Sequence, residues 1–129
     1  MSFKNILCFG TLNPDLIYFV DELPNKGDDI RSLNSSIRPG GTAINCSELI
    51  SLWDKSVHVR GNSIGSDPMG KYLVDYLKEN NINFDGLIIN QSLTPTCSIF
   101  VDSSGERTIV SSGYEGLEWS NFENLNNFD

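Results

Sequence analysis

The sequence has few of the residues that build metal centres and disulfide frameworks. Its 129 residues include one histidine, His58, and three cysteines, Cys8, Cys46 and Cys97. A single histidine rules out a multi-histidine metal site, and three widely separated cysteines suit reduced thiols better than a disulfide framework. We predict that the three thiols are buried and inert. A Cys/His nucleophile pair is disfavoured, because no cysteine lies near His58 in the sequence.

Basic residues and long apolar runs are also scarce. Nine Lys and Arg residues face seventeen Asp and Glu residues, which gives a formal net charge of -8 at pH 7. Such an acidic surface argues against nucleic acids and anionic membranes as partners. The start of the chain has no long apolar run, so we expect no signal peptide, no transmembrane span and a cytoplasmic location. The hydrophobic fraction of 39% is ordinary for one globular domain.

Two adjacent glycines mark the first candidate site. Gly40 and Gly41 separate an extended segment from an amphipathic helix that begins at Thr42. Adjacent glycines are costly in entropy, so they suit places where the backbone approaches another group or takes a positive φ. The helix would direct its first free N–H groups at this loop, and Asn45 could add an amide. The corner suits a polyhydroxylated or anionic ligand, and an ordinary tight turn before a helix would give the same pattern.

A second polar cluster follows the apolar run at residues 6–9. The run predicts a short buried strand, and Asn13 and Asp15 come just after its carboxyl end. Ligands of open α/β sheets bind outside the carboxyl ends of the strands. The Asp15 carboxylate can accept hydrogen bonds from two neighbouring hydroxyl groups, and the Asn13 amide can both donate and accept. These groups suit a sugar diol, although the sequence Asn-Pro-Asp is by itself a common turn.

Short apolar segments bounded by turn residues predict the strands. We expect strands at 5–9, 16–20, 30–33, 57–60 and 86–89, and a hairpin formed by 97–101 and 107–110. The apolar strands suit a central parallel sheet, whereas 16–20 and 30–33 have polar neighbours and suit a small exposed sheet. Alternation of these strands with helices predicts an α/β fold.

Three segments have helical patterns. We predict helices at 42–53, 69–80 and 119–128, of which the last is polar and weakly specified. Asp67 suits the N-cap of the second helix and Pro68 its first residue. The apolar face that we predict for the first helix consists of Ala43, Cys46, Leu49, Ile50 and Trp53.

The two polar clusters, in this order, resemble the PfkB family of carbohydrate kinases, also called the ribokinase family. Four further segments resemble family motifs in the family's order: 23–28, 61–70, 94–96 and 105–108. The resemblance extends along nearly the whole chain. It implies a ribokinase-like parallel-sheet core, here partial, with a small β-sheet lid whose strands lie at about 16–38.

The resemblance also implies an activity. In this family the γ-phosphoryl group of ATP passes to a hydroxyl group of a sugar or nucleoside, with Mg²⁺ as a further cofactor. The implied partners are a small sugar substrate and a second copy of the chain, bound through the lid. No catalytic residue and no metal ligand are assigned to this chain, and the implied substrate-binding residues are Asn13, Asp15, Gly40, Gly41, Thr42 and Asn45.

The sequence departs from the family pattern at several positions and in length. Thr42 stands where ribokinases often carry lysine, so the identity of the sugar stays open. Family members are much longer, and their Gly-Ala-Gly-Asp motif is not found here. We therefore expect residues 1–129 to be the N-terminal, substrate-binding part, without the C-terminal ATP-binding half and inactive alone, with exposed apolar surface and an unpaired strand edge.

Two other functions compete with the kinase as interpretations of the sequence. One is a stand-alone, non-catalytic sugar-binding or interaction module derived from such a kinase, which would keep Asp15 and Asn45. The other is a plain dinucleotide-binding domain, which is disfavoured because no G-x-G-x-x-G motif follows the first strand.

Overall fold

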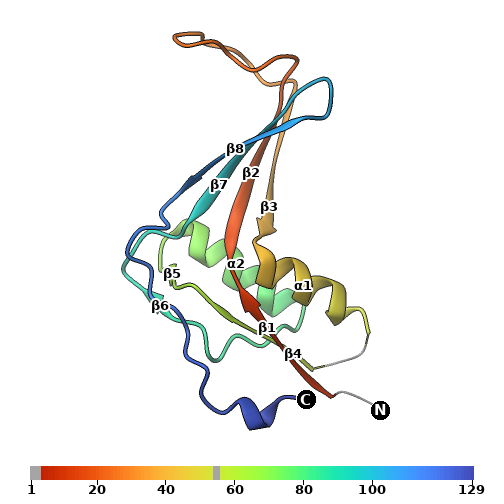
Figure 1. The fold of residues 1–129 in the computed structure, drawn as a ribbon, viewed down its shortest axis with the longest axis vertical. Coiled ribbons are helices and arrows are strands. Elements are labelled where there is room, and N and C mark those ends of the chain that lie inside the picture. The colour runs from red at the N-terminus through yellow and green to blue at the C-terminus, as the bar shows by residue number, and fades with distance from the viewer. Residues whose placement is uncertain (1–3, 54–55) are drawn as a thin grey trace.

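The computed structural model describes residues 4–53 and 56–129. The chain forms a helix-covered core from which a four-stranded sheet projects (Figure 1). Within the described ranges, no helix is both long and apolar enough to cross a membrane. In chain order the elements are β1 (Asn5–Gly10), β2 (Asn13–Phe19), β3 (Asn34–Gly40), α1 (Thr42–Ser51), β4 (Ser56–Gly61), β5 (Ile64–Gly65), α2 (Pro68–Glu79), β6 (Ile89–Asn90), β7 (Thr96–Val101), β8 (Arg107–Ser112) and a 3₁₀ turn at Leu125–Asn127.

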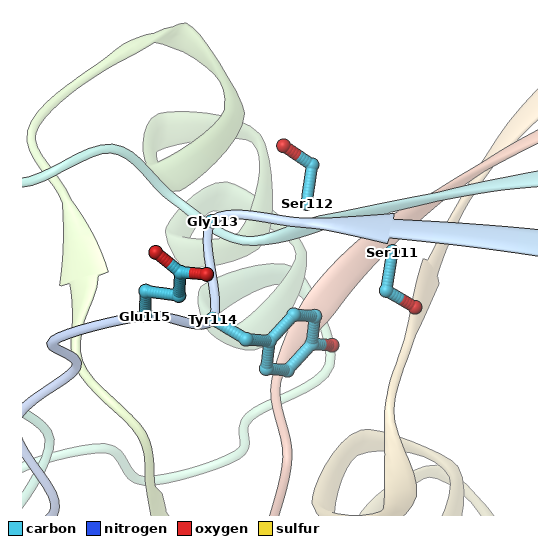
Figure 2. A pocket seen from close by; sticks show the side chains of 5 residues that line it. All are labelled: Ser111, Ser112, Gly113, Tyr114 and Glu115. Carbon is cyan, nitrogen blue, oxygen red and sulfur yellow. The ribbon is translucent and has the colours of Figure 1, made fainter.

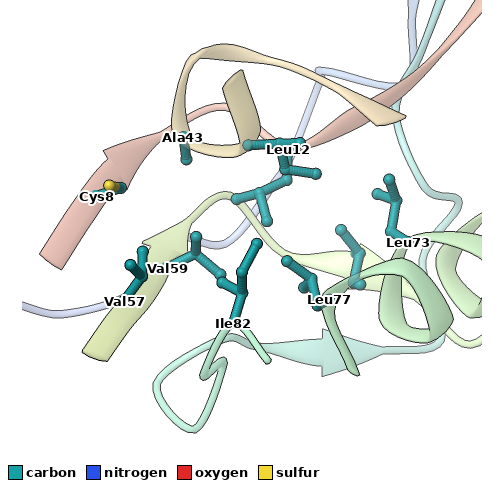
Figure 3. Close-up of a cluster of buried hydrophobic side chains, with 10 residues drawn as sticks. Cys8, Leu12, Ala43, Val57, Val59, Leu73, Leu77 and Ile82 are labelled. Atoms are coloured by element: carbon teal, nitrogen blue, oxygen red, sulfur yellow. The ribbon is translucent and has the colours of Figure 1, made fainter. Parts of the chain in front are cut away.

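The core is built on the parallel pair β1 and β4, which runs in register from Asn5 opposite Ser56 to Gly10 opposite Gly61. Side chains from this pair and from both helices meet in one buried cluster (Figure 3). Burying apolar surface of this kind contributes roughly 25 cal/mol per Å² and is the main stabilising term of the fold. The buried cluster consists of Cys8, Leu12, Ala43, Ile44, Val57, Val59, Ile64, Leu73, Leu77 and Ile82.

The helix α2 forms as its sequence predicts. The Oδ1 atom of Asp67, the N-cap, accepts a hydrogen bond of 2.8 Å from the Gly70 N–H group. Pro68 occupies the first helical turn, where it has no N–H group to leave unpaired. Leu73 and Leu77, four residues apart, lie on the buried face of the helix. The strength of these local signals explains why the predicted and observed bounds nearly coincide.

The lid is a separate sheet with the strand order β3-β2-β7-β8, which we call the lid sheet. β2 pairs antiparallel with β3 and parallel with β7, and β7 pairs antiparallel with β8. The structure thus confirms a partial parallel-sheet core with a separate small β-sheet lid, and it adds the β7–β8 hairpin to that lid. β2 starts at Asn13, three residues before the start we predicted.

Three predicted elements are wrong or misplaced. Residues 30–33 are irregular, because the partner of β2 is the polar segment Asn34–Gly40. Residues 119–128 contain only the 3₁₀ turn, and the backbone there is held to the core by a 2.8 Å hydrogen bond from Ser120 N–H to Gly61 O. The strand predicted at 86–89 is reduced to β6, which pairs with β5 and not with the β1–β4 pair.

The buried face of α1 also differs from the predicted one. Ala43, Ile44 and Ser47 are buried against β1 and β4, whereas Leu49 is 59% and Trp53 62% exposed. Because the Ser47 side chain is small, the helix can approach the strands closely. Its buried hydroxyl group is satisfied within the helix, where it donates a 2.9 Å hydrogen bond to Ile44 O. The exposed residues confirm the expectation of apolar surface left uncovered in this chain.

The thiols are not all buried. Cys8 is buried, as predicted, but Cys46 is exposed on α1 and Cys97 is half-buried on β7. Among the described residues β1 pairs with no strand other than β4, in agreement with the predicted unpaired strand edge. At the start of the strand, the Asn5 N–H and C=O groups are hydrogen-bonded to Asp129. Beside that edge Phe9 stacks on Phe122 with ring centroids 4.5 Å apart.

Candidate functional site

The loop between β1 and β2 is held by a buried asparagine. The Oδ1 atom of Asn62 accepts a 2.7 Å hydrogen bond from Leu12 N–H, and its Nδ2 atom donates one of 3.0 Å to Leu12 O. Asn62 has no exposed surface. A Cβ atom on the neighbouring Gly61 would overlap Gly10 O, so the two strand ends can approach this closely only with glycine at position 61. This arrangement fixes Leu12 in the core and presents Asn13 at the start of β2.

The same loop caps helix α1. The Thr11 and Thr42 hydroxyl oxygens each accept a 3.0 Å hydrogen bond from the backbone N–H group of the other residue. Thr11 O also accepts a bond of 3.1 Å from Ala43 N–H. Gly41 has a φ of +90°, and a Cβ atom there would overlap Thr11 O. The first N–H groups of the helix are therefore used inside the protein, and our expectation that they face a ligand is wrong for Thr42 and Ala43.

Asn13 and Asp15 lie on β2 itself and form a hydrogen-bonded pair. Asn13 is 2% exposed, and its Nδ2 atom donates a 2.7 Å hydrogen bond to Asp15 Oδ1. Gly40 lies opposite Asn13 on β3. A Cβ atom at Gly40 would collide with the Asp15 carboxylate, so this glycine provides the space that the carboxylate occupies.

Asp15 and Asn45, predicted from separate motifs, line one hollow of about 310 Å³. Asp15 is half-buried, and Asn45 is exposed on the first turn of α1. One face of the lid sheet forms the floor of the hollow. The side chains that line it are Asp15, Ile17, Phe19, Arg38, Pro39, Asn45, Ile99, Val101 and Arg107.

Two arginines of this hollow were missed as site residues. Arg38 lies directly opposite Asp15 on β3, and Arg107 lies opposite Val101 on β8. Both side chains are exposed, and they bring positive charge to a chain of net charge -8. The register places Arg38, Asp15, Cys97 and Ser111 in one row across all four strands. Such a row requires the pairing of β2 with β7, which joins segments that are distant in the sequence.

The environment of Asp15 changes its acidity. Burial raises the pKa of Asp15 above its ordinary value, and the Asn13 hydrogen bond and the Arg38 charge oppose that rise. The carboxyl group therefore takes up its proton at a higher pH than an exposed aspartate does. Any ligand that requires the ionised carboxylate would be released over that higher pH range.

A second hollow has a volume of about 600 Å³ (Figure 2). Residues 111–115 line it, and the Tyr114 side chain extends from this segment toward β2. The Tyr114 hydroxyl group donates a 2.8 Å hydrogen bond to Asn13 Oδ1. Sequence reasoning missed Tyr114, because the two residues are 101 positions apart and no motif connects them.

The described residues offer little that could bind a metal ion. No group of three or more His, Cys, Asp or Glu side chains is arranged there to hold a metal ion. Asp15 has an amide and a guanidinium group as its polar neighbours, which suit hydroxyl-bearing or anionic ligands better than a cation.

Comparisons with known proteins agree with this geometry. A family model described as pfkB family carbohydrate kinase matches residues 4–129. The chain is 28% identical to a ribokinase of Dictyostelium discoideum over 108 residues, which cover 83% of this chain and 34% of that protein. It is 30% identical to a ketohexokinase of Mus musculus over 112 residues, which cover 85% of this chain and 37% of that protein.

Solved structures show the same arrangement of elements. The Arabidopsis thaliana ribokinase complexed with ribose and ATP matches with a TM-score of 0.74 and 19% identity, over 87% of this chain and 36% of that one. The likeness shows a ribokinase-like fold. The chain spans about a third of the length of the curated relatives it matches. Their names agree on the class of kinase and differ in the sugar.

Proposed function

The chain belongs to the pfkB family of carbohydrate kinases, and from this premise we propose that it is the substrate-binding part of an ATP-dependent sugar or nucleoside kinase. The reaction is transfer of the γ-phosphoryl group of ATP to a hydroxyl group of the acceptor. The observation that carries the proposal is the convergence of Asp15 and Asn45 on one hollow. The family resemblance assigns both of these side chains, among others, to the sugar.

The residues of the hollow suit a polyhydroxylated ligand. One Asp15 oxygen accepts from Asn13, and the carboxylate retains lone pairs for two hydroxyl groups of the acceptor. Asn45 can donate to a further oxygen or accept from a further hydroxyl group. Gly40 and Gly41 contribute space and backbone shape, and Thr42 holds the loop to which Asn13 is attached. The lid sheet covers the acceptor and keeps water from the reacting phosphate.

The proposal assigns no described residue to ATP or Mg²⁺. Phosphoryl transfer relies on positioning and on neutralisation of phosphate charge. The hollow holds the acceptor but contains no cluster of carboxylates for a metal ion among the described residues. We therefore expect the 129-residue chain to bind the acceptor without phosphorylating it at a measurable rate.

We also propose that the lid sheet pairs with a second copy of the chain. The face turned away from the hollow has Leu16, Tyr18, Ile37, Phe100 and Val110, as the register requires. Tyr18 and Phe100 stack with ring centroids 5.5 Å apart, and Val110 is 58% exposed. Apolar surface of this kind is stabilised when it is covered.

Calorimetric titration tests the proposed function. The chain is titrated with ribose, fructose and adenosine, and the same solutions are then incubated with ATP and Mg²⁺ and analysed for phosphorylated product. We expect heat of binding for at least one acceptor and no product. Absence of binding for every sugar and nucleoside would refute the assignment of this hollow to the acceptor.

A further inference from the structure

We infer that Tyr114 is a positioning residue, which orients the Asn13 amide and through it the Asp15 carboxylate. The inference rests on the proposed function, because it concerns the carboxylate that holds the acceptor. Tyr114 would not contact the acceptor itself. Its hydroxyl group is linked to the carboxylate through two hydrogen bonds, of 2.8 Å to Asn13 Oδ1 and of 2.7 Å from Asn13 Nδ2 to Asp15 Oδ1.

The backbone around Tyr114 is fixed at the base of the lid sheet. Gly113 has a φ of +79°, and a Cβ atom there would lie 3.1 Å from Pro95 Cα. Pro95 immediately precedes β7, and Gly113 immediately follows β8, so the two ends of the hairpin are packed together. Farther along the same segment, Glu118 N–H donates a 3.1 Å hydrogen bond to Ser63 Oγ in the core. The half-buried Tyr114 ring therefore starts from an anchored backbone (Figure 2).

The Asn13 amide can satisfy its partners in one orientation only. Its Nδ2 atom faces two acceptors, Asp15 Oδ1 at 2.7 Å and Pro14 O at 3.3 Å. A flipped amide would set its oxygen against both, in a residue that is 2% exposed and has little water to compensate. The Tyr114 hydroxyl group donates to the amide oxygen and so selects the productive orientation. Burial raises the pKa of Tyr114, which keeps this hydroxyl group protonated at neutral pH.

Charged and titratable groups face Asp15 from every neighbouring strand. Arg38 lies opposite it on β3, and Cys97 lies opposite it on β7. Arg107 on β8 lines the same hollow, and Tyr114 follows the end of that strand. Removal of the Tyr114 hydroxyl group would release the Asn13 amide and weaken the hydrogen bond that lowers the pKa of Asp15. The carboxyl group would then become protonated at a higher pH than in the wild type.

The test compares Tyr114→Phe with a matched control. Tyr72→Phe also removes one hydroxyl group, which donates a 3.3 Å hydrogen bond to Ile37 O, whereas the Tyr114 hydroxyl group donates to Asn13 Oδ1. Binding of ribose, fructose and adenosine is measured by calorimetry from about pH 4 to about pH 8, and the Asp15 pKa is followed by carboxyl-carbon NMR. We expect Tyr114→Phe to weaken acceptor binding about three- to tenfold at neutral pH, which is the effect of losing one hydrogen bond. We also expect the loss of binding in acid to begin at a higher pH than in the wild type.

The outcomes separate the positioning role of Tyr114 from the proposed function. If a folded Tyr114→Phe variant loses binding in acid over the same pH range as the wild type and keeps the same Asp15 pKa, the positioning role is overturned. The proposed function would still stand in that case, provided that the wild type binds an acceptor. Wild-type failure to bind every acceptor would overturn both. If Tyr114→Phe does not fold, the wild type provides the answer by NMR. A slowly exchanging Tyr114 hydroxyl proton close to the Asn13 amide supports the inference, and a rapidly exchanging one contradicts it.

Discussion

Asp15 and Arg38 lie directly opposite each other on the antiparallel strands β2 and β3, and both line the hollow to which we assign the acceptor. The pairing sets a positive charge beside a half-buried carboxylate on the floor of the hollow. Burial raises the pKa of Asp15, whereas the Arg38 guanidinium and the Asn13 amide lower it.

Replacing Arg38 with Met should therefore make acceptor binding more sensitive to acid. Loss of the positive charge raises the pKa of Asp15 further, and binding that needs the ionised carboxylate is lost as the pH falls through that pKa. The midpoint of the calorimetric pH profile should move to higher pH. Arg31→Met is the matched control, because it removes the same charge outside the hollow. Equal shifts in the two variants would show that the effect comes from net charge alone.

The Asn62→Ala variant should be less stable. It leaves the Leu12 N–H and C=O groups, now bonded at 2.7 and 3.0 Å, without partners in a fully buried position. We expect the free energy of unfolding to fall by about 1–3 kcal/mol for each of the two unsatisfied buried groups. Urea denaturation followed by circular dichroism measures this change. A loss no greater than that of Asn80→Ala, where the replaced amide is exposed, would contradict this role of Asn62.

Gly41→Ala should disturb the site more than its small size suggests. The φ of +90° is unfavourable for any residue with a side chain, and the new Cβ atom would overlap Thr11 O. Strain of this kind costs about 1–3 kcal/mol. Thermal unfolding and acceptor titration should both be impaired. The same substitution at Gly105, which has a φ of +83° but open space around it, separates the backbone strain from the collision.

The proposed lid dimer is tested by two neighbouring substitutions. Val110→Lys places a charge on the apolar face away from the hollow, and Ile109→Lys places one on the face that lines it. Sedimentation analysis should show dissociation of the dimer in Val110→Lys and a retained dimer in Ile109→Lys. A wild type that is monomeric at all concentrations, or equal behaviour of the two variants, would reject an interface on this face.

An element can be predicted from the sequence when the contacts that stabilise it lie close together in the chain. Helix α2 was located to within one residue, because its start and its apolar face are encoded within a few positions around Asp67. The hairpin of β7 and β8 was found for the same reason. The polar strand β3 was not, because only pairing with β2 makes Asn34–Gly40 extended.

The candidate site likewise combines residues marked by local motifs with residues placed by contacts between distant segments. Asp15 and Asn45 could be selected from their local motifs, and the structure brings them to one hollow. Arg38 and Tyr114 could not, because their places depend on strand register and on a hydrogen bond between distant segments. The sequence also does not predict that Thr11 accepts hydrogen bonds from the first N–H groups of α1, since this depends on how closely two loops approach.

Acceptor binding by the Asp15→Ala variant is the most direct test of the account. The carboxylate holds the acceptor's hydroxyl groups, so its removal should weaken binding by about 2–3 kcal/mol in calorimetric titration, the range for a charge-assisted pair. Asn45→Ala should lose less, about 1 kcal/mol, because a neutral hydrogen bond is removed. Asp29→Ala, an exposed site with the same change of charge, should bind as the wild type does. Normal acceptor binding by a folded Asp15→Ala variant would contradict the proposal that the Asp15 carboxylate holds the acceptor.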